Sequence, residues 1–356
     1  MARVRRNNAR LRVGLVGYGV GGAAFHAPFV ATTPGLELSA IVTRDPARQQ
    51  QAARDHPDAR VVAEVERLWE PSAGIDVVVI STPNRTHVPL ALSAIEAGLH
   101  VVVDKPLATS VTEGRDVVSA AQRRGVVLSV FQNRRWDGDF QTIGRLLAER
   151  ALGTPLRFES RFERWRPTPT GSWRERGAPE EAGGLLFDLG SHLIDQALVL
   201  FGRASEVYAE LDRRRFGVEA DDDVFVALTH VSGMRSHLHM SAVAGQPAAR
   251  FRVLGTTASF TKWGLDVQEA ALRAGARPGT PEWGVEPAEQ WGTLGTETEV
   301  RRIPTERGDY GAFYAGLVRA VRSDAPPPVD PASAIAMLEV IEAARASAQQ
   351  RIVVRR

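Results

Sequence analysis

The sequence predicts an α/β protein with two parts: an N-terminal Rossmann domain with a doubly wound parallel sheet, and a C-terminal α+β domain with a large, mostly antiparallel open sheet. Two observations support this fold class. Short runs rich in Val and Ile alternate with helical segments over residues 11–131, as a buried parallel sheet requires. Later strands are longer and alternate apolar with polar residues, which is typical of an antiparallel sheet with one exposed face. We therefore expect domains at 1–131 and 132–356.

Each element of the first domain rests on a local pattern. Near-continuous β-branched runs predict buried strands at Leu11–Gly17, Leu36–Val42, Asp76–Ser81, His100–Val103 and Val126–Phe131. We expect helices at Gly22–Thr32 and Val88–Ala97, the second of which stops at Gly98.

The second domain is expected to place helices around an antiparallel sheet. Alternating patterns predict strands at Leu156–Arg164, Val224–His230, Arg235–Ala242 and Arg250–Gly255. The expected helices are Phe140–Glu149, Ser191–Phe201, Phe313–Arg322 and Ala332–Gln349.

Composition excludes several classes of function. The chain has 356 residues, 44% of them apolar, and its net charge of +2 gives no support to nucleic-acid binding. No run approaches the roughly 18 apolar residues of a membrane span. Cysteine is absent, which removes disulfides, thiolate nucleophiles and Cys-ligated zinc, and is compatible with the cytoplasm, where we expect the protein.

A glycine-rich loop follows the first predicted strand, in Gly17-Tyr18-Gly19-Val20-Gly21-Gly22. Gly17 permits a tight turn, Gly19 lets the backbone approach a pyrophosphate, and Gly22 allows close packing of helix on strand. We expect Tyr18 and Val20 to complete this cofactor-binding loop. The alternative is an ordinary glycine turn of an α/β domain.

The end of the second strand bears on the choice of cofactor. This place usually holds an acidic residue for the ribose 2′-hydroxyl, and here it holds Thr43 followed by Arg44. A hydroxyl beside a guanidinium suits a 2′-phosphate. The sequence therefore favours NADP, although the neighbouring Asp45 leaves NAD possible.

Polar residues follow the strand that ends at Ser81, at the sheet edge where open α/β sheets bind ligands. We place Thr82, Pro83, Asn84 and His87 among the cofactor-binding residues. Alternatively, Thr86 or Asn84 caps the next helix and His87 packs at its start.

Lys105 ends another buried strand, in Asp104-Lys105-Pro106. In a partly desolvated pocket beside a positive nicotinamide, its charge would be disfavoured and it could exchange a proton. We therefore expect Asp104 and Lys105 beside the cofactor and Lys105 in catalysis. A solvated or ion-paired lysine is the alternative.

Asp188, His192 and Asp195 follow the pair Gly183-Gly184 at helical spacing, so one helix face would hold all three. A histidine pKa of about 6.5 makes His192 the best base of the set, and predicts that alcohol oxidation accelerates as His192 loses its proton. Asp195 has an alternative role as a buried partner of His192 or of the backbone. No metal is expected, because no further ligands cluster nearby.

Together these motifs resemble the glucose–fructose oxidoreductase, inositol dehydrogenase and rhizopine-catabolism (Gfo/Idh/MocA) family over nearly the whole chain. The family's Glu-Lys-Pro is Asp104-Lys105-Pro106 here, an acid-for-acid departure, and its Gly-Gly-x-x-x-Asp-x-x-x-His matches Gly183 to His192. The segments 132–137, 255–260 and 308–314 are also similar, and favour a branch that includes NADP-dependent scyllo-inositol dehydrogenases.

The resemblance implies reversible oxidation of a secondary alcohol on a sugar or cyclitol. His192 would take the hydroxyl proton, Lys105 would polarise the oxygen, and Asp188 would orient the substrate and support His192. Substrate contacts are also expected from Arg135, Trp165, Trp173 and Arg174, although core packing explains the tryptophans equally well. The open sheet would form a homodimer or homotetramer. Rival hypotheses are a non-catalytic dinucleotide-binding regulator of sugar metabolism and a reductase of imines or other carbonyls.

Overall fold

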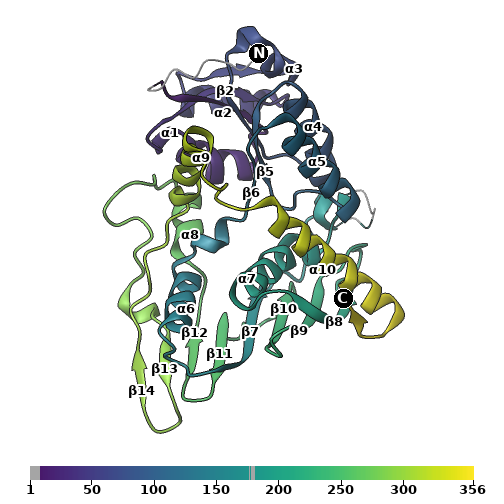
Figure 1. Ribbon diagram of the computed structural model, residues 1–356, viewed down its shortest axis with the longest axis vertical. Helices are drawn as coiled ribbons and strands as arrows, with labels where there is room; N and C mark the ends of the chain where they lie inside the picture. The colour runs from purple at the N-terminus through teal and green to yellow at the C-terminus, as the bar shows by residue number, and fades with distance from the viewer. Residues whose placement is uncertain (1–8, 176, 178–180) are drawn as a thin grey trace.

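The computed structural model describes residues 9–175, 177 and 181–356, which fold around two β-sheets (Figure 1). The first sheet has six parallel strands in the order β3-β2-β1-β4-β5-β6. These strands are β1 (Leu11–Val16), β2 (Leu36–Val42), β3 (Arg60–Val62), β4 (Val77–Ile80), β5 (His100–Asp104) and β6 (Leu128–Phe131). The order reverses between β1 and β4, as in the Rossmann fold, so the predicted parallel sheet is confirmed.

Five helices accompany this sheet, namely α1 (Ala27–Thr32), α2 (Pro46–Asp55), α3 (Glu66–Trp69), α4 (His87–Glu96) and α5 (Val111–Arg124). The sequence patterns did not single out α2, because it buries only Ala52 and so has no apolar stripe. Asp45 begins α2 by accepting hydrogen bonds from the backbone N–H groups of Ala47 (2.9 Å) and Arg48 (3.1 Å).

The predicted helix Gly22–Thr32 forms as two segments. A π-helical turn covers Gly21–His26 and α1 follows it. Pro28, in the first turn of α1, has no N–H to continue a regular ladder, and the wider turn precedes it.

The second sheet has nine strands in the order β14-β13-β12-β11-β7-β10-β9-β8-β15. Only β7 and β10 pair in parallel among the described pairings. The strands are β7 (Pro155–Glu163), β8 (Ala204–Asp212), β9 (Asp223–His230), β10 (Arg235–Ser241), β11 (Phe251–Gly255), β12 (Ser259–Lys262), β13 (Thr293–Gly295), β14 (Val300–Arg302) and β15 (Val354–Arg355). The predicted mostly antiparallel sheet is confirmed.

One face of this sheet is covered and the other is more open. In β9, Val224, Val226 and Leu228 are buried, whereas the alternate residue Phe225 is partly exposed and packs against His239 of β10. The helices of this half are α6 (Gly138–Ala148), α7 (Ser191–Phe201), α8 (Val267–Arg273), α9 (Gly311–Ser323) and α10 (Pro331–Gln350).

The end of the chain returns to the first sheet. Figure 1 shows α9 beside α1, and α10 running from α5 to β8. The Ser129 hydroxyl of β6 donates to Val329 O (3.0 Å) and accepts from Val329 N (3.2 Å). The described parts of residues 1–131 and 132–356 therefore pack together closely, and the domain boundary between residues 131 and 132 stays a proposal. None of the described helices combines the length and apolar character that crossing a membrane requires.

Candidate active site

Two connected hollows lie at the carboxyl ends of the parallel strands. The first, which we call the dinucleotide cleft, has a volume of about 750 Å³ and is lined by the glycine loop, the end of β2 and Thr82-Pro83. The second, which we call the chamber, has a volume of about 400 Å³ and contains Lys105, Asp188 and His192. Val20, Gly21 and Asp104 line both hollows, so a ligand in the cleft can reach the chamber.

The glycine loop fits a phosphate-bearing ligand. Gly17 has a φ of +98°, and a Cβ there would lie 2.1 Å from Ser81 O. A Cβ on Gly22 would lie 2.1 Å from Gly17 O, so both positions require glycine. A Cβ on Gly19 would meet only Arg48 Nη1, at 3.8 Å, within the described surroundings. The space beside Gly19 is therefore left to a ligand that approaches the backbone closely.

Tyr18 and Val20 contribute differently to this loop. The Tyr18 ring is buried and its hydroxyl donates to Asp55 Oδ2 (3.0 Å), so Tyr18 can serve the cleft mainly through its main chain. Val20 is 59% exposed and lines both cleft and chamber. Its side chain is placed to cover an apolar part of a ligand.

The end of β2 forms another wall of the cleft. Thr43 is buried, and Arg44 is exposed with its Nη2 3.2 Å from Glu64 Oε2. Arg48, in the first turn of α2, also lines the cleft. Asp45 is occupied in capping α2, which explains its presence without a ligand.

The segment after β4 divides between the two hollows and the core. Thr82 and Pro83 line the cleft, and Asn84 lines the chamber and donates to Ala182 O (3.2 Å). His87 is 1% exposed, and its ring nitrogens lie 2.8 Å from Pro106 O and 2.9 Å from Thr82 O. The geometry assigns His87 a structural role that joins two loops, which was the alternative reading of its sequence context.

Asp104 is held by several polar groups at the junction of the hollows. Its carboxylate accepts from Lys105 N (2.9 Å) and from the Ser81 hydroxyl (3.2 Å), and lies 3.5 Å from His26 Nε2. Burial raises the pKa of Asp104, but the interactions with His26 and Lys105 outweigh it and bring the pKa to about 2. Asp104 is therefore a fixed negative charge.

Lys105 joins the first sheet to the second half of the chain. Its Nζ donates to Asp188 O (2.5 Å) and to Asp188 Oδ1 (3.2 Å), and Arg174 Nε lies 3.4 Å from the same Oδ1. Burial raises the pKa of Asp188, but the charges of Lys105 and then Arg174 lower it to about 2. Lys105 and Asp188 thus form the ion pair that the sequence allowed for, at the wall of the chamber.

His192 lies in the first turn of α7 and is 6% exposed. Burial lowers its pKa well below the usual range, and the charges of Lys105 and Arg134 lower it further. Its Nδ1 is buried with no hydrogen-bond partner among the described residues, which leaves Nε2 as the nitrogen available to a bound alcohol. The lowered pKa favours the neutral imidazole, which is the form that accepts a proton.

The helical spacing predicted one shared face for Asp188, His192 and Asp195. Asp188 and His192 line the chamber, whereas Asp195 is buried and does not. Its carboxylate binds Arg135 bidentately, at 2.6 and 2.8 Å, away from the chamber. Asp195 is therefore a buried partner of Arg135, whose charge it balances.

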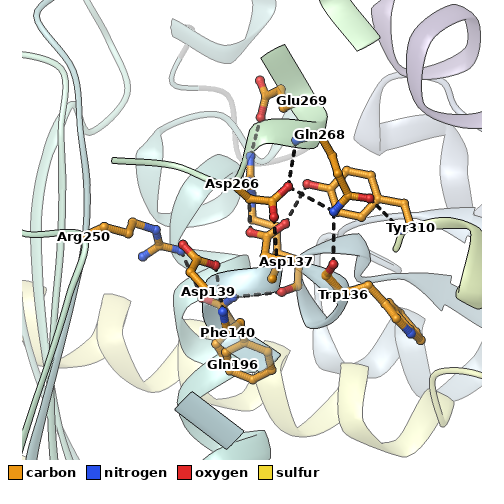
Figure 2. Close-up of polar contacts among 12 residues, drawn as sticks. Trp136, Asp137, Asp139, Phe140, Gln196, Arg250, Asp266, Gln268, Glu269 and Tyr310 are labelled. Carbon is orange, nitrogen blue, oxygen red and sulfur yellow. Dashed lines mark hydrogen bonds and ion pairs between the residues drawn. The ribbon is translucent and has the colours of Figure 1, made fainter. Parts of the chain in front are cut away.

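Arg134, and not its neighbour Arg135, lines the chamber. Figure 2 shows the polar network behind it, in which Asp137 meets Tyr310, and Asp266 meets Gln268. Arg134 binds Glu269 (2.5 Å) and Asp137 (3.2 Å), which fix its guanidinium. Arg135 is engaged by Asp195 and the Ser333 hydroxyl, so its predicted substrate contact has no support from this geometry.

The two tryptophans have different positions. Trp165 is 61% exposed and lines neither hollow, so it is neither core nor chamber wall. Trp173 lines both hollows, and the Arg174 guanidinium lies 4.6 Å from its ring centroid. Trp173 and Arg174 are thus placed as expected for residues that contact a ligand.

Several residues at the site escaped the sequence reasoning, namely Arg48, Trp69, Arg164, Arg166, Glu269 and Arg273. Arg48 was a usable signal, because it is a second basic residue close behind the end of the second strand. Glu269 and Arg273 lie on α8, which no motif connected with the chamber. Across the described ranges, no three His, Asp or Glu side chains gather as a metal site would require.

This fold and site define a nicotinamide-dependent oxidoreductase, and comparison with known proteins gives the family. Residues 11–132 match the oxidoreductase family NAD-binding Rossmann fold, and residues 145–355 match its C-terminal alpha/beta domain. The chain belongs to the Gfo/Idh/MocA family of oxidoreductases, as its motifs predicted.

Individual relatives cover almost the whole chain. The uncharacterized oxidoreductase YdgJ of Escherichia coli (strain K12) is 41% identical over 345 residues, covering 96% of this chain and 97% of YdgJ. The scyllo-inositol 2-dehydrogenase (NADP(+)) IolW of Bacillus subtilis (strain 168) is 35% identical, covering 98% of this chain and 96% of IolW. The solved structure of the putative oxidoreductase yvaA from Bacillus subtilis superposes with a TM-score of 0.93 at 34% identity, covering 99% of this chain and all of yvaA.

Proposed function

We propose that this enzyme oxidises a secondary alcohol of a sugar or cyclitol to a ketone, reversibly, with NADP as the preferred cofactor. The observation that supports this most is the convergence of Lys105, Asp188 and His192 where the dinucleotide cleft opens into the chamber. The relative IolW, named as an NADP-dependent scyllo-inositol dehydrogenase, supports the same class of substrate.

Each side chain has a role in the reaction that follows from its charge. A bound nicotinamide would supply the hydride acceptor. His192, held neutral by burial and nearby cations, accepts the hydroxyl proton. Lys105 donates a hydrogen bond to the reacting oxygen, and Asp188 positions the Lys105 Nζ through its carboxylate and its main-chain carbonyl. Asp104 supports the same strand end.

Two rival functions use the same fold. A non-catalytic regulator would have no use for a neutral buried histidine beside a paired lysine, so the chamber favours catalysis. A reductase of imines or other carbonyls could use the same side chains. A spectrophotometric screen of inositols, aldoses and imines with both cofactors separates the three hypotheses.

The preference for NADP rests on charge at the end of β2. Arg44 and Arg48 both line the cleft, and the acidic residue typical of NAD enzymes is replaced by Thr43. Glu64, 3.2 Å from Arg44, offsets part of this charge while NADP is absent. A 2′-phosphate would compete with Glu64 for the Arg44 guanidinium, and Arg48 would add a second donor.

We also propose that the protein assembles as a homodimer or homotetramer through the open face of the second sheet, in the cytoplasm. Phe225, His237 and His239 lie on this face, only partly buried, and their rings pack together. Such a partly apolar sheet face is suited to a second copy.

Replacing Lys105 or His192 by alanine should lower turnover by about a hundred- to ten-thousandfold, because each acts on the reacting hydroxyl. Binding of NADPH, measured by fluorescence titration, should be retained, because neither residue belongs to the glycine loop. Arg124→Ala, an exposed position at the end of α5, serves as the control. Near wild-type turnover in either variant rejects the assigned role.

The pH dependence follows from the lowered pKa of His192, which places its titration on the acid side of the ordinary histidine value. The imidazole accepts a proton only when neutral, so activity is lost as the pH falls through this pKa. We expect kcat/KM for oxidation to change by less than about threefold between about pH 6.5 and 8.5. A tenfold rise over that interval would instead place the base near an unperturbed histidine.

Arg44→Ala should lower kcat/KM with NADP by about ten- to a hundredfold and leave NAD use nearly unchanged, because a charged hydrogen bond to the 2′-phosphate is lost. Arg67→Ala, on the exposed side of α3, is the matched control. Equal kcat/KM for both cofactors in the wild type would contradict the NADP assignment.

The assembly is measured by size-exclusion chromatography with light scattering. The wild type should have a mass of two or four chains, and Phe225→Asp should lower it by burying a charge in the interface. Val231→Asp, in the exposed turn after β9, should leave the mass unchanged. A monomeric wild type refutes the proposed assembly.

A further inference from the structure

The chamber has more positive than negative side chains. Six cations line it and three carboxylates oppose them, within the described part of the chain. The cations are Lys105, Arg134, Arg164, Arg166, Arg174 and Arg273, and the carboxylates are Asp104, Asp188 and Glu269. A neutral polyol would not require this excess.

Two of the three carboxylates already have cationic partners. Asp188 lies 3.2 Å from Lys105 Nζ and 3.4 Å from Arg174 Nε. Glu269 binds Arg134 at 2.5 Å and Arg273 at 3.0 Å. No carboxylate of the described chamber wall is therefore left for Arg164 and Arg166.

The third carboxylate of the chamber is Asp104. It is engaged by the backbone N–H of Lys105 and faces His26 on its other side. It lies at the junction with the dinucleotide cleft, where it borders the cofactor site.

Arg164 is a partly buried cation of the chamber that has no ion-pair partner within the described residues. It follows β7, is partly buried, and places its guanidinium 4.6 Å from the ring centroid of Phe162. Within the described residues its side chain forms no ion pair within 4.0 Å and donates no hydrogen bond, although Glu269 and Asp188 act on it at longer range and its backbone N–H binds Ser241 O. Burial lowers the pKa of Arg164 and the nearby Arg166 lowers it further, and the more distant Glu269 and Asp188 offset only part of this.

The phosphates of the cofactor do not provide this partner. The glycine loop that fits the pyrophosphate belongs to the dinucleotide cleft, which Arg164 does not line. Arg164 shares the chamber instead with Lys105 and His192, on the substrate side.

We propose that the alcohol oxidised by this enzyme bears an anionic group, a carboxylate or a phosphate monoester, that binds the Arg164 guanidinium. The inference rests on the proposed function and adds the charge of its substrate. A guanidinium matches either anion with two parallel hydrogen bonds. Phe162 holds the guanidinium in place, which reduces the entropy lost on binding.

The test compares neutral and anionic substrates of similar shape. Initial rates with NADP are measured for glucose against glucuronate and glucose 6-phosphate, and for myo-inositol against myo-inositol 1-phosphate. In at least one comparison the anionic compound should have a kcat/KM about ten- to a hundredfold above its neutral counterpart. Glucuronate and the phosphate esters distinguish a carboxylate from a phosphate.

Variants then locate the preference. Arg164→Gln should lower the anionic-to-neutral ratio of kcat/KM by about ten- to a hundredfold, while Arg164→Lys keeps part of it. Arg235→Gln removes an arginine outside the chamber and should leave the ratio unchanged. A ratio that Arg164→Gln does not change would overturn the proposal, whatever the activity of the variant.

Failure of the inference is distinguishable from failure of the proposed function. If neutral compounds are preferred in every comparison, the inference falls and the oxidoreductase assignment stands. If none of the compounds is turned over, the proposed sugar or cyclitol substrate is wrong. Calorimetric titration of the NADPH-bound enzyme with the same compounds then decides the charge preference: tighter binding of the anions supports it, and equal or weaker binding overturns it.

Discussion

The contact between Lys105 and Asp188 is the interaction on which the site depends. Lys105 ends a strand of the first sheet, and Asp188 lies on the π-helical turn before α7, which packs on the second sheet. The Lys105 Nζ binds both the main-chain oxygen and the carboxylate of Asp188, so it fixes the backbone as well as the side chain. Both groups are largely shielded from water, where an ion pair is screened less than at the surface. The two halves of the site are therefore held in one register.

The cations of the chamber, Lys105 among them, also lower the pKa of His192. Burial alone lowers the pKa of an imidazole, and Lys105, Arg134 and Arg164 add to this effect. A chamber rich in positive charge thus keeps its base neutral without a dedicated hydrogen-bond partner. An anionic substrate bound at Arg164 would offset part of that charge and increase the basicity of His192 when the alcohol is in place. Substrate charge and proton acceptance are then linked through one electrostatic field.

Sequence patterns predicted what depends on local rules. The glycine loop, the β-branched strands and the Lys105 and His192 motifs are short, and their neighbours determine their conformation. They could not distinguish Arg134 from Arg135, because adjacent residues differ only in which side of a short turn they occupy. The helical spacing also could not show that Asp195 is bound by Arg135, which lies 60 residues earlier in the chain. Arg164 and Glu269 needed the tertiary fold, since elements distant in sequence bring them to one chamber.

The two hollows depend on different kinds of chemistry. The dinucleotide cleft relies on backbone geometry, since Gly17 and Gly22 leave no room for a Cβ. Such a site tolerates little change in sequence, and it does not depend on which substrate the chamber binds. The chamber instead relies on long side chains, such as Arg164 after β7 and Glu269 of α8, which belong to the second half of the chain. Because their replacement leaves the parallel sheet intact, charge in the chamber can change while the hydride-transfer geometry is kept. In the function proposed above, substrate charge is read by side chains of the second half, beside a cofactor cleft that the first half mainly builds.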